Sequence, residues 1–266
     1  MYTDLHTHTK VFSPDAEMSI EELMDTAVKK ELSMVAVTEH FEYKNPDPND
    51  NIQTFDLGLY TKTFSSWKER CPSGLDLLMG IEFGYQTHTA SEIDEIAGSA
   101  PFDIVLLSNH LFRGVDVFYS DVVYKLPVKE RHAEYMAKMA EMVEKCNNFD
   151  VAAHYDYVNK RNPDSVTNMC YDDCPSEFDR FFEVLIAKEK ALEINTSTSY
   201  RRNSMPDAKV IDRYLKMGGK LITVSSDSHT KDNLGRLIPE MTEFLKAVGV
   251  RELCYFKNRK VNTFSI

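Results

Sequence analysis

Histidine and carboxylate residues at regular spacing are the main chemical feature of this chain. His6 and His8 are two residues apart, and on a β-strand this spacing directs both imidazoles to the same face. Asp227 and His229 repeat the spacing with a carboxylate and an imidazole. Six of the eight histidines lie in the opening pair or near the end of a short apolar run: His6, His8, His40, His110, His154 and His229. With Glu82, these nitrogen and oxygen donors predict a site for Zn, Mn or Fe rather than a cysteine-based zinc site.

Seven short apolar runs must position these donors, because each run stops at a polar residue that can bind or react. The runs are Tyr2 to His6, Met34 to Glu39, Leu77 to Glu82, Asp103 to Asn109, Asp150 to His154, Ala191 to Asn195 and Lys220 to Ser226. Their near-continuous apolar character is typical of strands that are buried on both faces. Helical patterns lie between several runs: a capping box at Ser19 and Glu22, and the segments 127–146, 177–190 and 206–217.

Strands that alternate with helices predict a parallel sheet. Since polar residues gather where the predicted strands end, we expect an α/β barrel of the (β/α) type with its site at the carboxyl ends of the strands. An open doubly wound sheet is the alternative, but no glycine-rich phosphate loop follows the first strand. We expect a single domain over residues 1–266, with the long polar stretches 41–54 and 155–176 as candidate lids.

Charge and composition disfavour several classes of protein. The formal net charge of −11 opposes non-specific nucleic-acid binding, because an acidic surface repels phosphodiester backbones. The five cysteines form no regular framework and indicate reduced thiols. No apolar run approaches the roughly 20 residues that span a membrane, and the start of the chain does not look like a signal peptide. We therefore expect a cytoplasmic protein without nucleic-acid or membrane partners, whose oligomeric state stays open.

These motifs together resemble the PHP (polymerase and histidinol phosphatase) family, and within it the monofunctional histidinol-phosphate phosphatases. The resemblance runs almost from end to end and rests on Asp4-Leu-His-Thr-His8, Val37-Thr-Glu-His40, Gly80-Ile-Glu-Phe-Gly84, His110, His154 and Ser226-Asp-Ser-His229. The motifs are specific as a set and weak singly. The family fold is a distorted, TIM-like (β/α)7 barrel, which agrees with the seven apolar runs.

The resemblance implies three divalent metal ions (Zn, Mn or Fe, or a mixture) in adjoining cages. The first cage is implied to use His6, His8, Glu82 and Asp227. Glu82 would bridge to a second ion that is also held by His110 and His154. A third ion would use His40, His229 and Asp15, at a position where many relatives carry histidine.

The implied activity is hydrolysis of a small phosphomonoester, L-histidinol phosphate, to L-histidinol and phosphate in histidine biosynthesis. A metal-activated hydroxide would attack phosphorus in line, so that no phosphoenzyme forms. Asp227 or His229 is the candidate acid for the leaving alkoxide, although both are also candidate ligands.

Substrate contacts are expected from loops at the same end of the barrel. The candidates for phosphate binding are His40, Arg161, Arg201 and Arg202, with Arg202 favoured over Arg201. The candidates for the amine and imidazole of the substrate are Glu39, Glu42, Asp156, Tyr43 and Phe112, and Glu39 has a second possible role in orienting a ligand.

Three other functions compete with this interpretation. The same cage serves phosphodiesters in relatives, so a PHP exonuclease or nucleotide phosphatase is one alternative, but the acidic charge disfavours a polymer. A protein-tyrosine phosphatase would need an open site, whereas the long loops predict a covered one. A metal-binding regulatory module without turnover is the non-enzymatic alternative, and the complete ligand set disfavours it.

Overall fold

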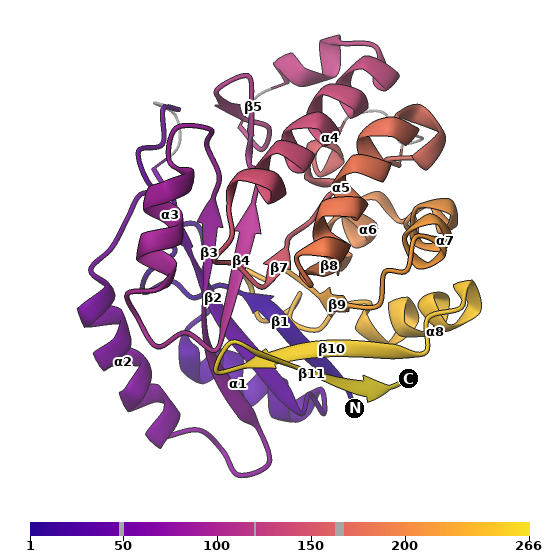
Figure 1. Ribbon diagram of the computed structural model, residues 1–266. Helices are drawn as coiled ribbons and strands as arrows, with labels where there is room; N and C mark the ends of the chain where they lie inside the picture. The colour runs from indigo at the N-terminus through magenta and orange to yellow at the C-terminus, as the bar shows by residue number, and fades with distance from the viewer. Residues whose placement is uncertain (48–50, 120, 163–167) are drawn as a thin grey trace.

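Seven parallel strands form a nearly closed barrel in the computed structural model (Figure 1). The structure describes residues 1–47, 51–119, 121–162 and 168–266, apart from the side chain of Arg202. Their spatial order follows the chain: β1 (Thr3–Thr7), β2 (Met34–Phe41), β3 (Asp76–Gly84), β4 (Ile104–Ser108), β7 (Val151–Ala152), β8 (Ala191–Asn195) and β9 (Ile222–Ser225). The ring closes where Thr7 pairs with Ser228 and the His8 amide donates to the Ser228 carbonyl over 2.9 Å. The predicted α/β barrel is confirmed.

Each of the seven predicted runs overlaps one strand of the barrel, and β1, β2 and β3 extend beyond their runs. The run from 150 to 154 is the one that differs most, because only Val151 and Ala152 pair with both β4 and β8. The chain then turns at His154, whose φ of 22° is incompatible with an extended strand. A short strand followed by a turn therefore places this imidazole at the rim.

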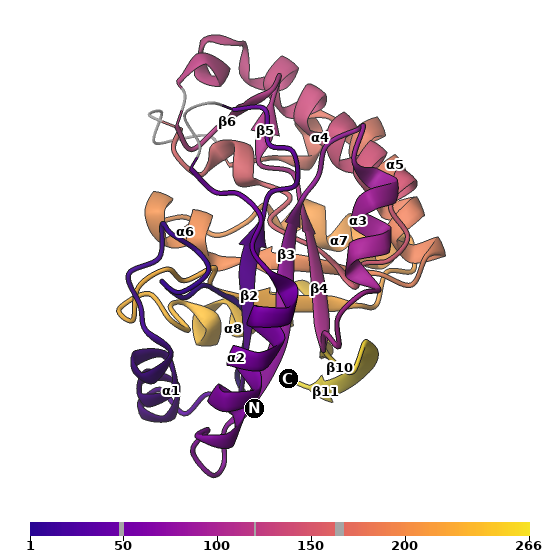
Figure 2. The ribbon, with the colours of Figure 1, turned by 90° about the vertical axis from the view of Figure 1, so that its left-hand side faces the viewer.

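Helices cover the outer surface of the barrel (Figures 1 and 2). They are α1 (Ile20–Lys29), α2 (Leu57–Glu69), α3 (Ala90–Ala97), α4 (Val128–Lys145), α5 (Pro175–Ala187), α6 (Thr196–Arg202), α7 (Ala208–Lys216) and α8 (Ile238–Val248), with the short 3-10 helices η1 (Val122–Lys125), η2 (Tyr157–Asn159) and η3 (Tyr171–Asp173). The capping box predicted at Ser19 and Glu22 begins α1. Sequence patterns predict α1, α4, α5 and α7 but not α2, although Tyr60, Phe64 and Trp67 have helical spacing there. None of the described helices is long and apolar enough to cross a membrane.

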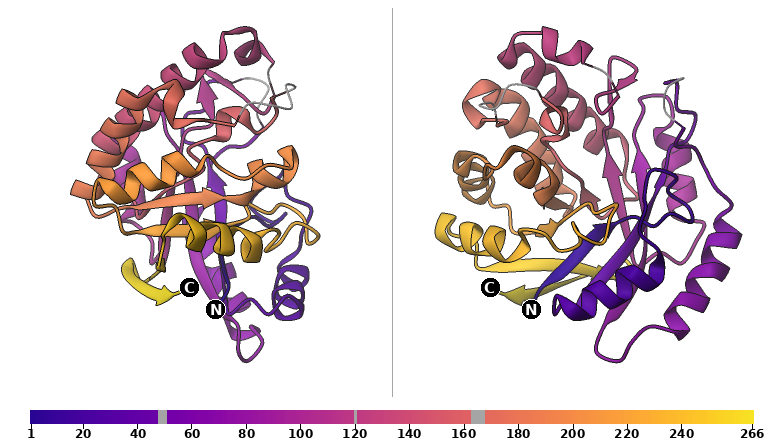
Figure 3. Two further views of the ribbon diagram at one scale, coloured as in Figure 1. Left: turned by 90° about the vertical axis from the view of Figure 1, so that its right-hand side faces the viewer. Right: turned by 180° about the vertical axis from the view of Figure 1, so that it is seen from behind.

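Apolar side chains fill the lower part of the barrel interior and leave the polar strand ends at the other end. Leu5, Leu78 and Leu106 are among these interior residues. The antiparallel hairpin of β10 (Glu252–Lys257) and β11 (Lys260–Ser265) lies against the bottom of the barrel and adds Cys254 and Phe256 to this core (Figures 1 and 3). A smaller hairpin, β5 (Leu111–Phe112) with β6 (Val115–Asp116), lies in the long connection after β4. A second and larger core packs between the sheet and the helices.

Candidate metal centre

Strand ends and strand register bring the predicted ligands together. His40 and Glu82 are register partners on the neighbouring strands β2 and β3. The end of β1, which carries His6 and His8, is joined by the closing bridge to the segment 227–229 after β9. The other predicted ligands lie at the same end of the barrel: Asp15, His110 and His154. Nine residues that are far apart in the sequence therefore form one cluster.

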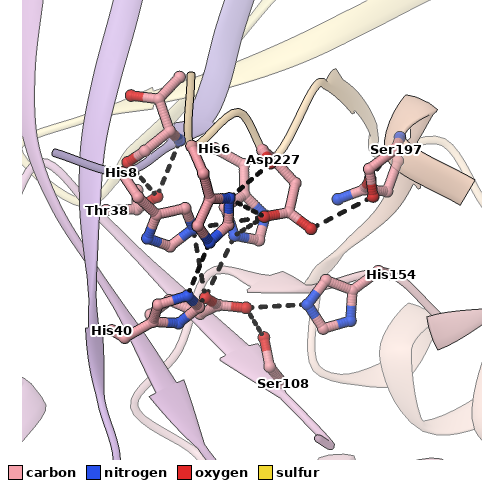
Figure 4. Close-up of polar contacts among 12 residues, drawn as sticks. His6, His8, Thr38, His40, Ser108, His154, Ser197 and Asp227 are labelled. Atoms are coloured by element: carbon pink, nitrogen blue, oxygen red, sulfur yellow. Dashed lines mark hydrogen bonds and ion pairs between the residues drawn. The ribbon is translucent and has the colours of Figure 1, made fainter. Parts of the chain in front are cut away.

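Glu82 lies at the centre of the cluster and is fully buried. Its Oε2 atom is 3.2 Å from His6 Nε2 and 3.6 Å from His8 Nε2. Asp227 Oδ1 lies 3.7 Å and 3.4 Å from the same two nitrogens. Figure 4 shows His6, His8 and Asp227 directed toward one another. These four side chains are the set predicted for the first cage.

The other carboxylate oxygen of Glu82 faces a second group of ligands. Oε1 is 3.2 Å from His110 Nε2 and 2.9 Å from His154 Nε2, and it accepts a hydrogen bond from the Ser108 hydroxyl at 2.5 Å. Glu82 thus offers one oxygen to each of the first two predicted cages, as a bridging carboxylate requires.

The third predicted cage is also assembled. Asp15 Oδ2 is 3.0 Å from His229 Nε2 and 3.6 Å from His40 Nε2, and the two imidazole nitrogens are 3.2 Å apart. The opposite nitrogen of His40, Nδ1, is 2.7 Å from Glu82 Oε2. His40 therefore connects the third cage to the central carboxylate.

Unsatisfied buried atoms show that the cluster fits metal ions. Among the described residues, His6 Nε2, His8 Nε2, His40 Nδ1 and Glu82 Oε2 are buried without a hydrogen-bond partner. Leaving such atoms unpaired is costly unless a bound group compensates. Donors held about 2.1 Å from one ion stand about 3.4 Å apart in a tetrahedron, which is close to the separations given above. All the donors are imidazole nitrogens or carboxylate oxygens, and such a set fits divalent transition-metal ions.

Two carboxylates outside the cluster fix the orientation of the imidazoles. His6 Nδ1 is 2.9 Å from Glu193 Oε1, and the His154 amide donates to Glu193 Oε2 over 2.8 Å. His110 Nδ1 is 2.6 Å from Glu42 Oε1. The contacts of His6 and His110 use the outer nitrogen of the imidazole and leave Nε2 directed into the cluster, whereas that of His154 uses its backbone amide. Glu42 therefore contacts a ligand, and not the substrate cavity as the sequence suggested.

Sequence reasoning did not identify Glu193, although a signal was present. Glu193 lies in the run from 191 to 195, and no ligand was assigned to that strand end. Glu39, in contrast, has the orienting role considered for it: it accepts hydrogen bonds from the Thr9 amide at 3.1 Å and the Ser13 hydroxyl at 2.6 Å. Ser13 Oγ in turn lies 3.4 Å from His8 Nδ1.

Opposite charges in the cluster shift the pKa values of its members. Burial opposes protonation of His6, but the carboxylates of Glu82 and Glu193 outweigh burial and raise its pKa well above the usual value. Burial also opposes ionisation of Glu82, yet His6 and other imidazoles hold its pKa well below the usual value. Burial also opposes ionisation of Asp227, but Lys160 and His6 outweigh burial and lower the pKa of Asp227. The site thus keeps its carboxylates ionised and favours positive charge among them.

Two of the ligands have strained backbone conformations. The φ angles of His154 and Asp227 are 22° and 52°. Positive φ costs a residue with a side chain on the order of 1–3 kcal/mol, so it persists only where surrounding contacts enforce it. The Glu193 contact to the His154 amide and the 2.5 Å ion pair of Lys160 with Asp227 Oδ2 supply such contacts. The strain directs both side chains into the site.

A cavity of about 200 Å³ adjoins the ligands and contains both acidic and basic groups. Its lining includes Asp15, His40, Ile52, His110, Asp116, Phe118, Tyr119, Tyr157, Lys160, Arg201, Asp227, His229 and Thr230. Ile52 comes from the first predicted lid, and Tyr157 and Lys160 come from the second. Both lid segments also contain residues outside the described ranges.

The basic residues of the cavity differ in part from those expected. Arg201 lines it, but Arg161 does not: its guanidinium donates to the Phe118 carbonyl at 2.8 Å and lies 4.7 Å from the centre of the Phe118 ring. Lys160, which sequence reasoning passed over, lines the cavity instead. The side chain of Arg202 lies outside the described part of the chain. Asp156, Tyr43 and Phe112 are also absent from the described lining.

Comparison with known proteins agrees with this geometry. The family model of the PHP domain matches residues 4–197. The chain belongs to the PHP domain family. A relative from Clostridium acetobutylicum, named a probable histidinol-phosphatase, is 29% identical over 97% of this chain and 95% of its own length. The histidinol-phosphatase of Lactococcus lactis is 26% identical over 97% of this chain and 96% of its own length.

Solved structures extend the comparison to the whole barrel. The histidinol phosphate phosphatase of Lactococcus lactis, crystallised with zinc, L-histidinol and phosphate, superposes with a TM-score of 0.84 at 25% identity and covers 98% of each chain. HisK from Listeria monocytogenes has a TM-score of 0.72 at 18% identity, with 88% of this chain and 97% of that chain covered, and shares the fold.

Proposed function

We propose that the protein is a metal-dependent phosphomonoesterase that hydrolyses L-histidinol phosphate to L-histidinol and phosphate. The observation that carries this proposal is the complete cluster around Glu82, found in a chain that is similar over 98% of its length to an enzyme crystallised with zinc, L-histidinol and phosphate. Cluster and substrate chemistry agree, because a phosphate dianion needs a concentrated positive charge.

The described ligands support three divalent ions, with Zn, Mn or Fe as the candidates. His6, His8 and Asp227 would hold the first ion, His110 and His154 the second, and Asp15, His40 and His229 the third, with Glu82 shared by the first two. Bound ions of this kind lower the pKa of water and neutralise charge on phosphoryl oxygens. Nitrogen and oxygen donors without thiolate are the reason for these three metals.

Lys160 and Arg201 are suited to bind the phosphoryl group. Both line the cavity; Lys160 Nζ is 2.5 Å from Asp227 Oδ2, and the Arg201 guanidinium lies 5.7 Å from the centre of the Phe118 ring. An ammonium and a guanidinium at the cavity wall would hold the two oxygens that point away from the ligands. This assignment replaces Arg161 by its neighbour and keeps one of the two predicted arginines of the second loop.

Asp227 and His229 remain the residues proposed to contact the reacting group, since both line the cavity and belong to the ligand set. His229 Nδ1 lies 3.0 Å from the Asp227 carbonyl, so that its Nε2 faces Asp15. The lowered pKa of Asp227 keeps its carboxylate ionised, which suits it to hold a cation rather than to protonate the alkoxide.

The organic part of the substrate would occupy the aromatic side of the cavity. Phe118, Tyr119 and Tyr157 line that side, and they can pack against an imidazole ring. Asp116 is a buried carboxylate in the same wall and accepts from the Tyr157 hydroxyl at 3.1 Å. With Glu39 and Glu42 engaged elsewhere, Asp116 is the carboxylate best placed to attract the ammonium or imidazolium of histidinol.

A substrate panel with metal analysis tests this proposal. The purified protein is assayed on L-histidinol phosphate, p-nitrophenyl phosphate, a nucleoside monophosphate, a dinucleotide and a phosphotyrosine peptide, and its metal content is measured on the same sample. The expected result is bound transition metal and a kcat/KM for histidinol phosphate at least about a hundredfold above the others, since buried polar recognition discriminates strongly. Preference for the dinucleotide or the peptide would overturn the substrate assignment, and metal binding without any turnover would favour the regulatory alternative.

A further inference from the structure

A second cavity lies at the end of the barrel opposite the metal centre. Its volume is about 520 Å³, and it lies between the segment after α5, the segment after α7 and the hairpin β10–β11. We call it the lower pocket and define it by Lys190, Tyr214, Lys220, Phe256 and Arg259. Figure 3 shows the hairpin at this end of the barrel, near both chain termini.

The hairpin wall of the lower pocket is held in place by buried and half-buried contacts. Arg259, in the hairpin turn, forms an ion pair with Asp150 at 2.5 Å and donates to the Asn148 side chain at 3.0 Å. Its backbone amide donates to the Asp103 carbonyl at 2.9 Å. These bonds link the turn to the starts of β4 and β7, so the pocket is formed by fixed elements.

The lining carries an excess of positive charge although the whole chain has a net charge of −11. Four basic side chains face two acidic ones there: Lys188, Lys190, Lys220 and Arg259 against Asp150 and Glu189. Arg259 neutralises Asp150, and the Lys188 ammonium donates to the carbonyls of Glu144 at 2.8 Å and Cys146 at 2.9 Å.

Lys190 and Lys220 are the basic groups of the lining that form no direct ion pair or hydrogen bond with the described residues. No carboxylate of the described residues forms an ion pair within 4.0 Å of either ammonium. The Lys190 ammonium is partly buried and lies 5.2 Å from the centre of the Phe149 ring. Burial lowers the pKa of Lys190, and the nearby Asp150 carboxylate offsets only part of this effect. An anion in the pocket would offset the remaining cost of burial.

The remaining walls are apolar. The rings of Tyr214 and Phe256 are almost fully buried behind the wall, and Ile186, Leu221 and Val261 contribute accessible aliphatic side chains. The Tyr214 ring packs directly on Gly219, where an added Cβ would lie 2.5 Å from ring atoms, so its position behind the wall is restricted. Such walls favour a ligand with a flat apolar body.

We propose that the lower pocket binds a small organic anion. A carboxylate, sulfonate or phosphate group lies between the ammonium groups of Lys190 and Lys220, and a planar apolar body packs against the aliphatic wall of Ile186, Leu221 and Val261. This binding is separate from the metal centre and does not depend on the proposed phosphatase activity.

Fluorescence titration with 8-anilinonaphthalene-1-sulfonate, an aromatic sulfonate, tests the proposal on the metal-loaded protein. We expect one site, weakened about tenfold or more in Lys190→Met/Lys220→Met, because two charge-assisted contacts are lost. Lys216→Met removes an exposed lysine that pairs with Asp212 and should leave affinity unchanged.

Glu189→Gln is the complementary variant, because it removes a negative charge from the lining and should strengthen binding severalfold. Because partly unfolded protein also binds this dye, near-UV circular dichroism must show native packing in each variant before affinities are compared. Histidinol-phosphate turnover should be unchanged in all these variants. Equal affinity in the wild type and the double lysine variant, or no binding to the wild type at 1:1 stoichiometry, would overturn the proposal. The lysines would then serve only to place positive charge near the carboxyl ends of α5 and α7.

Discussion

Glu193→Gln is the most direct test of how the metal centre is oriented. The carboxylate of Glu193 accepts from two directions: Oε1 faces His6 Nδ1 at 2.9 Å, and Oε2 accepts from the His154 amide at 2.8 Å and the Asn195 side chain at 3.1 Å. Glutamine has nearly the same shape but only one acceptor oxygen. In Glu193→Gln, the NH2 group must therefore face one of these two sets of partners.

The geometry decides which contact is lost. Turning the NH2 group toward His154 and Asn195 would oppose two donors, so the amide oxygen stays there and the NH2 group faces His6. His6 then keeps an unsatisfied Nδ1 proton, or it moves the proton to Nε2, the atom that faces Glu82 and Asp227. A protonated Nε2 cannot bind metal. The cost is about 1–3 kcal/mol for the buried donor, or a loss of about 10–100-fold in metal affinity or activity.

Metal affinity by chelator competition and kcat/KM for histidinol phosphate measure this loss. Glu39→Gln is the matched control, because the partners of Glu39 include the hydroxyls of Thr9 and Ser13, which can rotate to accept from an amide. Burial also raises the pKa of Glu39 to about 7, so a neutral group replaces it with little change. We expect less than about threefold loss in the control. Equal losses in the two variants, or wild-type metal affinity in Glu193→Gln, would refute the reasoning.

Four further outcomes are expected. Glu82→Ala should remove bound metal and abolish turnover, and retained turnover would contradict the bridging role; metal analysis and a phosphate-release assay measure both. Lys160→Met should raise KM by about tenfold or more, whereas Arg161→Met should change it little, because only the lysine lines the cavity; the reverse order would restore the arginine assignment. Gly84→Ala should cost about 1–3 kcal/mol in urea unfolding and weaken metal binding, since the added Cβ would lie 1.9 Å from the Glu42 carboxylate; wild-type stability would show that Glu42 moves freely. Removing metal with a chelator should lower the melting temperature by about 2–4 °C for each kcal/mol of binding energy lost, as calorimetry would show, and an unchanged value would mean that no ion stabilises the fold.

The barrel and most of the candidate ligands were accessible from the sequence because both leave local marks, whereas Asp15 and the grouping into cages came from the family resemblance. Buried parallel strands produce apolar runs, and functional residues of such a barrel follow the runs directly, so that His8, Glu82 and Asp227 stand out in one dimension. The hairpin β10–β11 and helix α2 left weaker marks, since their apolar residues are few or mixed with polar ones. Patterns of this kind report elements, not the contacts between them.

Residue types and strand spacing by themselves determined that His6 and His8 share a face, that the chain has seven strand-like runs, and that the donors are nitrogen and oxygen. Only the tertiary structure decided that Glu193 supports His6, that Glu42 supports His110, and that Lys160 rather than Arg161 lines the cavity. The physical reason is that these choices depend on strand register and on the direction of a turn. A one-residue change in a turn exchanges the side chain that faces the ligand for one that faces solvent, and residue type alone does not specify it.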